Sequence, residues 1–177
     1  MKKNLLIGAF ALLGFAASAQ TQGKGNFKLG AHIGLPTGNL ADQTSFNLGA
    51  DVAYLFNIDG KFKAGITTGY SHYFAKGDEL NYYLPGYGNI RIKYTDTGII
   101  PVAATAQYNF VPNVFFGADL GYAFFVTGGN GVTGAFYFQP KVGYQLNNNE
   151  FYLSYKGMSK DGTTIGSVNL GYAYTFK

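Results

Sequence analysis

The sequence contains no cysteine, no tryptophan and few charged residues, which make up 12% of its 177 positions. Without cysteine, a disulfide framework, a thiolate metal site and a cysteine nucleophile are excluded, and so is a lipid-modified cysteine. Soluble domains usually carry about 25% charged residues, so this chain is poorly suited to a fully hydrated surface. After residue 19 there is no apolar run of about 18 residues, the length that predicts a membrane-spanning helix.

Glycine and aromatic residues are abundant instead, with 26 Gly, 15 Tyr and 16 Phe. The mean hydropathy is close to zero, which excludes a bundle of membrane helices and fits a chain whose residues alternate between two solvents. The formal net charge of +4 is too small to indicate a nucleic acid or an acidic substrate as a partner.

The first residues have the pattern of a secretory signal peptide. Lys2 and Lys3 form a basic start, residues 5–17 are uncharged and mostly apolar, and Ala-Ser-Ala at 17–19 fits a cleavage site. The apolar stretch is too short to span a membrane. We therefore expect residues 1–19 to be a signal peptide for Sec-type export, and residues 20–177 to form one domain.

The rest of the chain alternates apolar and polar residues with a period of two. In the last stretch, Val168, Leu170 and Tyr172 share one face, while Ser167 and Asn169 share the other. A period of two over about ten residues predicts a β-strand. Eight stretches show this pattern: 26–35, 45–57, 61–74, 98–110, 114–126, 135–146, 151–158 and 167–177.

The connections between these stretches alternate in length. Those at 57–61, 111–113 and 147–150 are tight and rich in turn residues. Between them lie longer segments at 35–44, 75–98, 127–133 and 159–164. This alternation is typical of membrane barrels with short periplasmic turns and long outer loops. The sequence therefore predicts an all-β fold, an eight-stranded antiparallel up-and-down transmembrane β-barrel.

Aromatic residues near the predicted strand ends favour the same fold, because aromatic rings prefer the interface between lipid and water. The candidates are Tyr54, Phe56, Tyr108, Phe110, Tyr144 and Phe151 at the periplasmic side, and Tyr70, Tyr122 and Phe124 at the outer side.

The charged residues inside the predicted strands all lie on the face opposite the apolar one. They are Lys28, Asp51, Lys63, Asp119, Lys141 and Lys156. A lysine on the lipid face at mid-depth costs about 2–4 kcal/mol, whereas a soluble barrel would carry its charges outside. The pattern therefore predicts a charge network in the lumen of a membrane barrel.

Distance from the turns predicts the height of each charge. Asp51, Asp119, Lys141 and Lys156 belong near mid-height, whereas Lys28 and Lys63 belong near the periplasmic mouth. The last three of the mid-height residues fall on consecutive strands and can pair, and Asp51 can approach them across the lumen. An eight-stranded barrel is just wide enough for side chains to fill it. The network is therefore either a structural plug or the lining of a narrow passive channel.

Taken together, the eight strands and the motifs "IIPVAATAQYNF", "FFGADLGYAF" and "LGYAYTF" resemble the small outer-membrane β-barrel domain family, also called the porin-family barrel. The chain is similar to outer-membrane protein X and to the barrel of outer-membrane protein A. The resemblance implies a monomer in the outer membrane of a Gram-negative-type bacterium, in contact with outer-membrane lipid and lipopolysaccharide. It also implies insertion by the barrel assembly machinery, and it brings no catalytic residues and no cofactor.

Some eight-stranded outer-membrane barrels are lipid A-modifying enzymes, and serine-type chemistry would need a histidine close to a serine. The chain has two histidines. We expect His32 to face the lumen without a serine at matching spacing. His72 is next to Ser71, but consecutive strand residues point to opposite faces. The sequence therefore predicts no enzyme, no metal site and no cofactor, with the lipid A-modifying enzyme as a remote alternative.

The longest predicted loop, 75–98, is the remaining candidate for a functional surface, because function often lies in loops. An exposed surface rich in tyrosine and glycine can be adhesive, as in binding loops generally. The segment is either such a surface or a plain extension of its flanking strands. The predicted role is therefore structural or surface-interacting, and the possible contact residues are Tyr82, Tyr83, Tyr87, Arg91 and Lys93.

Overall fold

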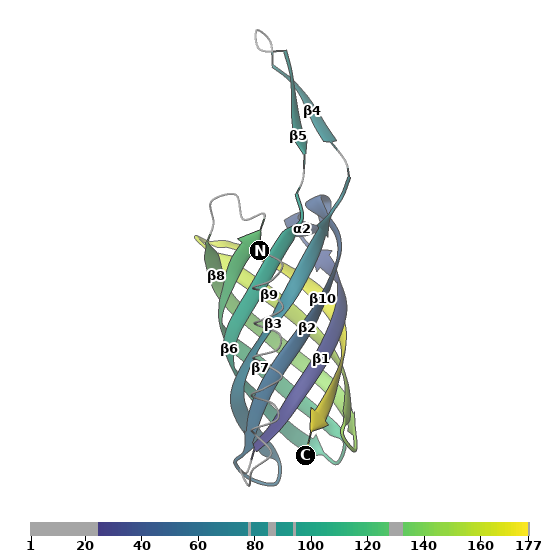
Figure 1. Ribbon diagram of the computed structural model, residues 1–177, viewed down its shortest axis with the longest axis vertical. Helices are drawn as coiled ribbons and strands as arrows, with labels where there is room; N and C mark the ends of the chain where they lie inside the picture. The colour runs from purple at the N-terminus through teal and green to yellow at the C-terminus, as the bar shows by residue number, and fades with distance from the viewer. Residues whose placement is uncertain (1–24, 78, 85–87, 94, 128–132, 177) are drawn as a thin grey trace, which may run out of the picture.

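Eight antiparallel strands close into a barrel in the order β1-β10-β9-β8-β7-β6-β3-β2 (Figure 1). The computed structural model describes residues 25–77, 79–84, 88–93, 95–127 and 133–176. The eight predicted strands and the up-and-down order are confirmed, and the first and last strands close the barrel. The barrel strands are β1 (Gly25–Thr37), β2 (Thr44–Asn57), β3 (Phe62–Ala75), β6 (Thr97–Val111), β7 (Val114–Thr127), β8 (Gly134–Leu146), β9 (Asn149–Lys160) and β10 (Thr163–Phe176).

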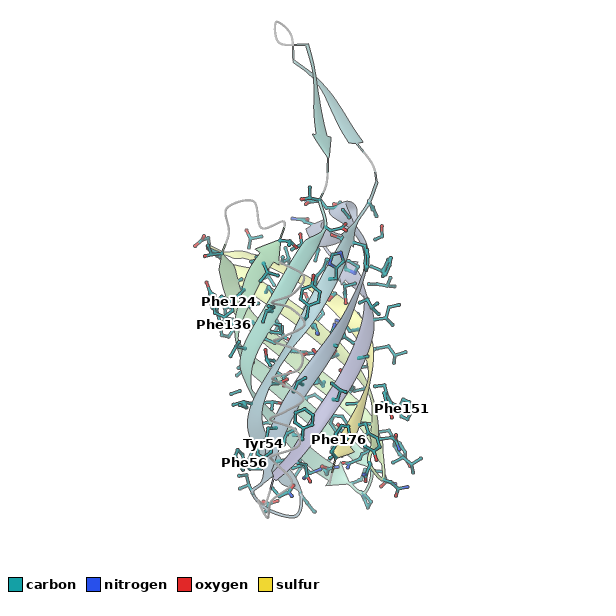
Figure 2. The ribbon with its side chains drawn as sticks, viewed as in Figure 1. Tyr54, Phe56, Phe124, Phe136, Phe151 and Phe176 are labelled. Atoms are coloured by element: carbon teal, nitrogen blue, oxygen red, sulfur yellow. The ribbon has the colours of Figure 1, made fainter. Side chains whose placement is uncertain are left out.

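The outer wall of the barrel is largely apolar, and most polar residues of the strands face the lumen. In β10 the exposure alternates residue by residue, with Leu170 62% exposed and Asn169 fully buried. Such alternation follows from the pleat, which sends successive side chains to opposite faces. Figure 2 shows Tyr54, Phe56, Phe151 and Phe176 around the lower end, and Phe124 and Phe136 near the upper end. Aromatic residues therefore ring the wall near both ends.

A short helix and a separate hairpin lie at the upper end of the barrel as drawn in Figure 1. Helix α2 (Asn39–Gln43) links β1 to β2. Strands β4 (Glu79–Leu84) and β5 (Gly88–Lys93) form a two-stranded sheet of their own that projects beyond the barrel. This arrangement is closer to the predicted strand extension, but the hairpin does not continue the barrel ladder. In the described segments, no helix is long and apolar enough to cross a membrane.

Two of the predicted long loops are shorter than expected. Strands β9 and β10 continue to Lys160 and Thr163, so a two-residue turn replaces the expected loop at 159–164. Asp161 and Gly162 adopt positive φ angles of 50° and 78°, and Asp-Gly is a preferred pair for such hairpin turns. The segment 35–44 is likewise mostly strand and α2.

The tight turn between β2 and β3 is held by a carboxylate. Both the Lys61 and Phe62 backbone N–H groups donate to Asp59 Oδ1 at 2.7 Å. These hydrogen bonds, first that of Lys61 and then that of Phe62, hold the pKa of Asp59 below its ordinary value. Because the folded pKa is lowered, this contribution to stability is present above the unfolded pKa and is lost as the pH falls through the folded one.

Three prolines lie inside barrel strands, Pro36, Pro101 and Pro140, and the last two interrupt one ladder each. The β3–β6 pairing stops at Thr68–Val102 and resumes at Ser71–Ile99, around Pro101. Likewise the β8–β9 pairing is interrupted around Pro140. Proline has no N–H to donate, so a gap in the ladder is the expected consequence.

Candidate functional site

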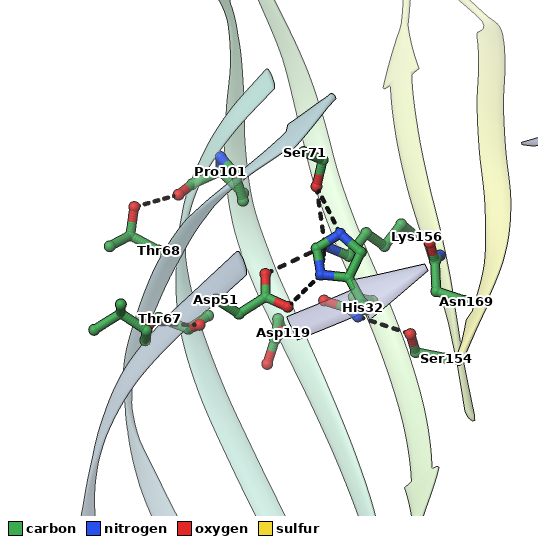
Figure 3. A network of polar contacts seen from close by, with 12 residues as sticks. His32, Asp51, Thr67, Thr68, Ser71, Pro101, Asp119, Ser154, Lys156 and Asn169 are labelled. Carbon is green, nitrogen blue, oxygen red and sulfur yellow. Dashed lines mark hydrogen bonds and ion pairs between the residues drawn. The ribbon is translucent and has the colours of Figure 1, made fainter. Parts of the chain in front are cut away.

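The lumen at mid-height contains a compact polar cluster built from β1, β2, β3 and β9 (Figure 3). The Lys156 Nζ lies 3.3 Å from Asp51 Oδ1, 3.0 Å from His32 Nε2 and 3.1 Å from Ser71 Oγ. Lys156 is 1% exposed and His32 is 3% exposed. We call these four residues the central cluster.

Hydrogen bonds join the four residues of the central cluster. The three N–H donors of the Lys156 ammonium are matched by a carboxylate oxygen, an imidazole nitrogen and a hydroxyl oxygen. His32 Nδ1 lies 2.7 Å from Asp51 Oδ2 and donates its proton there. On the other side of the ring, His32 Nε2 faces both the Lys156 ammonium and the Ser71 hydroxyl, at 3.0 Å each. A buried charged pair with satisfied hydrogen bonds is the arrangement that avoids an uncompensated ion.

A glycine explains how His32 reaches Ser71 from two strands away. His32 pairs with Gly49 in the β1–β2 ladder, and Gly49 pairs with Ser71 in the β2–β3 ladder. A Cβ at Gly49 would collide with the His32 imidazole and with the carbonyl oxygen of Tyr70. The imidazole therefore lies across Gly49 and its Nε2 comes to 3.0 Å from the serine hydroxyl.

This contact corrects one expectation from the sequence. His32 does face the lumen, but the expectation that it has no serine partner was wrong, because Ser71 is brought to it by strand register. Spacing within one strand could not reveal the pair. The second histidine, His72, instead contacts Asp96 at 3.1 Å beside the upper loop.

A second ion pair crosses from β7 to β8. Lys141 Nζ lies 2.7 Å from Asp119 Oδ2, and the Asp119 side chain is 2% exposed. In the ladder Asp119 pairs with Gln139, two residues from Lys141, so the ion pair is a diagonal contact on the lumen face. Gln139 donates in turn to Ser154 Oγ at 2.8 Å, which extends the polar layer to β9.

A third pair lies lower, toward the tight turns. Lys28 Nζ contacts Glu150 Oε1 at 2.6 Å and Gln107 Oε1 at 2.6 Å, and the Glu150 side chain is 3% exposed. Lys63 lies near this level and reaches Gln145 Oε1 at 3.5 Å. Glu150 was assigned to a turn by its sequence context. Glu150 is two and four residues from Tyr152 and Ser154, which face the lumen. This spacing indicates that Glu150 faces the lumen as well.

All six charged residues proposed from the sequence therefore lie on the lumen side, with additional partners in His32, Ser71 and Glu150. Lys156 does not pair with Asp119, its neighbour in the prediction, but with Asp51 across the lumen. Between the central and the lower layers a cavity of about 50 Å³ remains. A water needs about 10–15 Å³ of such volume, so the cavity has room for a few waters.

The surface-loop candidates lie outside this network. Tyr82 and Tyr83 belong to β4, and Arg91 and Lys93 belong to β5, so strand register places them on the projecting hairpin. Tyr87 lies outside the described residues. The hairpin pairs Tyr82 with Ile90 and Asn81 with Arg91.

The contacts from Asp51 to His32 and from His32 to Ser71 follow the order of a hydrolytic triad. A serine nucleophile needs space for a substrate carbonyl about 3 Å from its hydroxyl and from oxyanion donors. Ser71 is 3% exposed, and the Lys156 ammonium occupies the position next to its Oγ. The arrangement thus packs the lumen and leaves no open face on the serine. Within the described ranges, no group of three His, Cys, Asp or Glu side chains is placed to hold a metal ion.

An apolar outer wall around a charged and hydrogen-bonded lumen defines the class of protein. A soluble barrel places its apolar side chains inside, whereas this barrel exposes Leu120, Leu170 and Ile66 by 56%, 62% and 68%. Only hydrocarbon is a favourable solvent for such a wall. The chain is a transmembrane β-barrel.

Solved structures carry the same fold. A de novo designed transmembrane β-barrel matches with a TM-score of 0.53 at 12% identity, over 88% of this chain and 98% of that one. The attachment invasion locus protein Ail of Yersinia pestis matches with a TM-score of 0.49 at 13% identity, over 88% of this chain and 100% of that one. The outer membrane protein OprG from Pseudomonas aeruginosa matches with a TM-score of 0.47 at 10% identity, over 88% and 97% of the two chains.

Such low identities carry the fold and nothing beyond it. No protein-family model and no curated protein matches the chain. The predicted eight-stranded transmembrane β-barrel is confirmed at the level of fold.

Proposed function

We propose that this protein is an integral outer-membrane barrel whose lumen is filled by side chains, with a structural or surface-interaction role through its outer loops. The observation that carries the proposal is the central cluster, in which Lys156, His32, Asp51 and Ser71 meet at mid-height. Three strands from one side and β9 from the other contribute to it, so its side chains cross the lumen. A passage for solute would have to break these contacts.

The rest of the proposal follows from the sequence. Residues 1–19 would direct Sec-type export, and residues 20–177 would be inserted by the barrel assembly machinery as a monomer. Outer-membrane lipid and lipopolysaccharide would surround the apolar wall. The β4–β5 hairpin supports a surface role, because it projects beyond the barrel and carries Tyr82, Tyr83, Arg91 and Lys93 (Figure 1).

Conductance across a planar bilayer tests the filled lumen against the alternative of a narrow passive channel. We expect the purified protein to give no steady single-channel openings, because the central cluster lies across the lumen and the Asp119–Lys141 pair fills part of it from the β7–β8 wall. The double variant Asp119→Ala/Lys141→Ala removes one complete ion pair and widens the cavity below the cluster, so it should open more often. Steady openings of the unmodified protein would establish the channel.

The remote enzyme alternative has its own test. The protein is incubated with lipopolysaccharide, and the mass of lipid A is then measured. We expect no change in mass, because Ser71 is buried and in contact with the Lys156 ammonium. A change in lipid A mass that disappears in the Ser71→Ala variant would show that the Asp51–His32–Ser71 contacts are catalytic.

A further inference from the structure

The upper part of the lumen is apolar, in contrast to the polar layers beneath it. Tyr73, Ile99, Ala123, Tyr137 and Met158 form a buried cluster on the inner face, against which Leu40, Phe125 and Ile165 pack. Membrane barrels are usually polar inside, because an open mouth is filled with water. Contact with lipid explains apolar side chains on the outer wall, but it does not explain apolar side chains on the inside of the mouth.

Above this cluster lies a cavity of about 540 Å³. Its walls include Ile99 on β6, Phe125 on β7, Met158 on β9 and Ile165 on β10, and Leu40 of α2 closes one side. The volume lies within the range of about 300–1,000 Å³ that is typical of small-molecule sites. In Figure 1 the helix lies at the upper end of the barrel, where these strands end.

The two tyrosines of the buried cluster direct their hydroxyl groups to polar residues of the lumen. The Tyr73 hydroxyl lies 3.0 Å from Ser167 Oγ, and the Tyr137 hydroxyl donates to Gln139 Oε1 at 2.6 Å. Both partners are buried polar residues of the lumen. The phenol oxygens are thus satisfied by the polar layer, and the aromatic rings contribute to the apolar cluster above it.

The rim of the cavity is polar and carries a cation. Lys160 lines the cavity together with the uncharged residues Asn39, Gln43, Thr97 and Thr163. Lys160 is two and four residues from Met158 and Lys156 on β9, so strand geometry starts its stem on the inner face, and its side chain is exposed at the mouth. Asp161 also lines the rim, but it belongs to the turn and not to the alternating strand.

We propose that this cavity, which we call the apolar vestibule, binds a linear amphiphile of the fatty-acid type. The hydrocarbon chain lies against Ile99, Phe125, Met158 and Ile165, and the carboxylate lies at Lys160. The apolar walls exclude a sugar or a peptide of high polarity, because such a ligand would lose its hydrogen bonds to water without replacement. The cation at the rim favours an anionic headgroup over an uncharged one. This site is independent of the filled lumen, since it lies above the polar layers.

The two methionines of the chain, Met1 and Met158, give a direct reporter. The full chain is labelled with ¹³C-methyl methionine, placed in lipid nanodiscs to avoid detergent, and titrated with decanoate. The Met158 signal is identified by its loss in the Met158→Leu variant. We expect a saturable shift of the Met158 methyl signal, because this side chain lines the cavity.

Three variants make the test specific. Ile165→Gln should weaken decanoate binding by about tenfold, because an amide in the apolar wall must lose hydration when the chain enters. Leu40→Gln on α2 repeats this test outside the barrel strands, in case the first variant folds poorly. Ile58→Gln makes the same change in an exposed turn at the opposite end and should leave binding unchanged.

The headgroup is tested by comparing decanoate with decanol. Lys160→Gln should weaken the binding of decanoate several-fold and leave decanol unchanged. A Met158 shift that grows linearly with decanoate and never saturates would mean partition into the bilayer and would overturn the proposal. Equal decanoate affinities in Ile165→Gln, Leu40→Gln and Ile58→Gln would overturn it as well, and so would binding of decanol without decanoate.

Discussion

The variant Lys156→Met should lower the free energy of unfolding by about 3–5 kcal/mol, the usual cost of removing one partner from a buried ion pair. Methionine keeps the length of the side chain but takes three donors from the central cluster. Asp51 then keeps only the hydrogen bonds from His32 and Tyr152, and His32 Nε2 loses the ammonium. The free energy is measured by reversible urea unfolding in lipid vesicles.

Two further variants make this result interpretable. Lys160→Met makes the same change four residues along β9, at an exposed position, and should leave the free energy of unfolding unchanged. The double variant Lys156→Met/Asp51→Asn removes both charges and should recover part of the loss, because no uncompensated ion remains. Equal stabilities of the Lys156→Met and Lys160→Met proteins would show that the central cluster does not stabilise the barrel.

A charge on the outer wall should be nearly as harmful as the loss of one from the lumen. Leu120→Lys places an ammonium on the apolar wall at the height of Asp119, and should cost about 2–4 kcal/mol in a bilayer. Leu120 is 56% exposed, so in water the same change would be almost neutral. The measurement is again the free energy of unfolding in lipid vesicles.

The control for this variant is Ile58→Lys. Ile58 is 63% exposed in the turn between β2 and β3, beyond the apolar wall, and the lysine should be tolerated there. If Leu120→Lys unfolds at the same urea concentration as the unmodified protein, hydrocarbon does not cover that part of the wall.

The strands could be predicted from the sequence because two solvents act on their two faces. In β10, apolar and polar residues alternate from Val168 to Phe176, and the structure shows this alternation as exposure and burial. At residues 160–164 burial no longer alternates, since the residues on both faces of the hairpin are exposed. The strand ends there were therefore missed, although the Asp161–Gly162 turn signal was present.

The contacts of the lumen were harder to predict. Alternation alone places a charge inside, but its partner depends on the register of every ladder in between. His32 meets Ser71 only because Gly49 lies between them in two registers, and a slip of one residue would turn one of them outward. Lys156 meets Asp51 across the lumen, and no ladder joins β9 to β2.

The apolar vestibule is the third feature that the sequence did not predict. Met158, Ile165 and Phe125 are separated along the chain and lie close to strand ends. An apolar residue on the inner face of one strand interrupts the expected pattern only once, so it gives no signal by itself. When the barrel closes, these apolar side chains from separate strands come together at its upper mouth.

The central claim is that hydrocarbon covers the outer wall, and the absence of tryptophan allows one direct measurement of it. Leu170→Trp puts the only tryptophan on the wall, and Ile58→Trp puts the only tryptophan in the turn. In vesicles of brominated lipid, we expect strong quenching of tryptophan at position 170 and little quenching at position 58, with the reverse order for aqueous iodide. Tryptophan at position 170 that is quenched by iodide and unaffected by brominated lipid would contradict a membrane-spanning barrel.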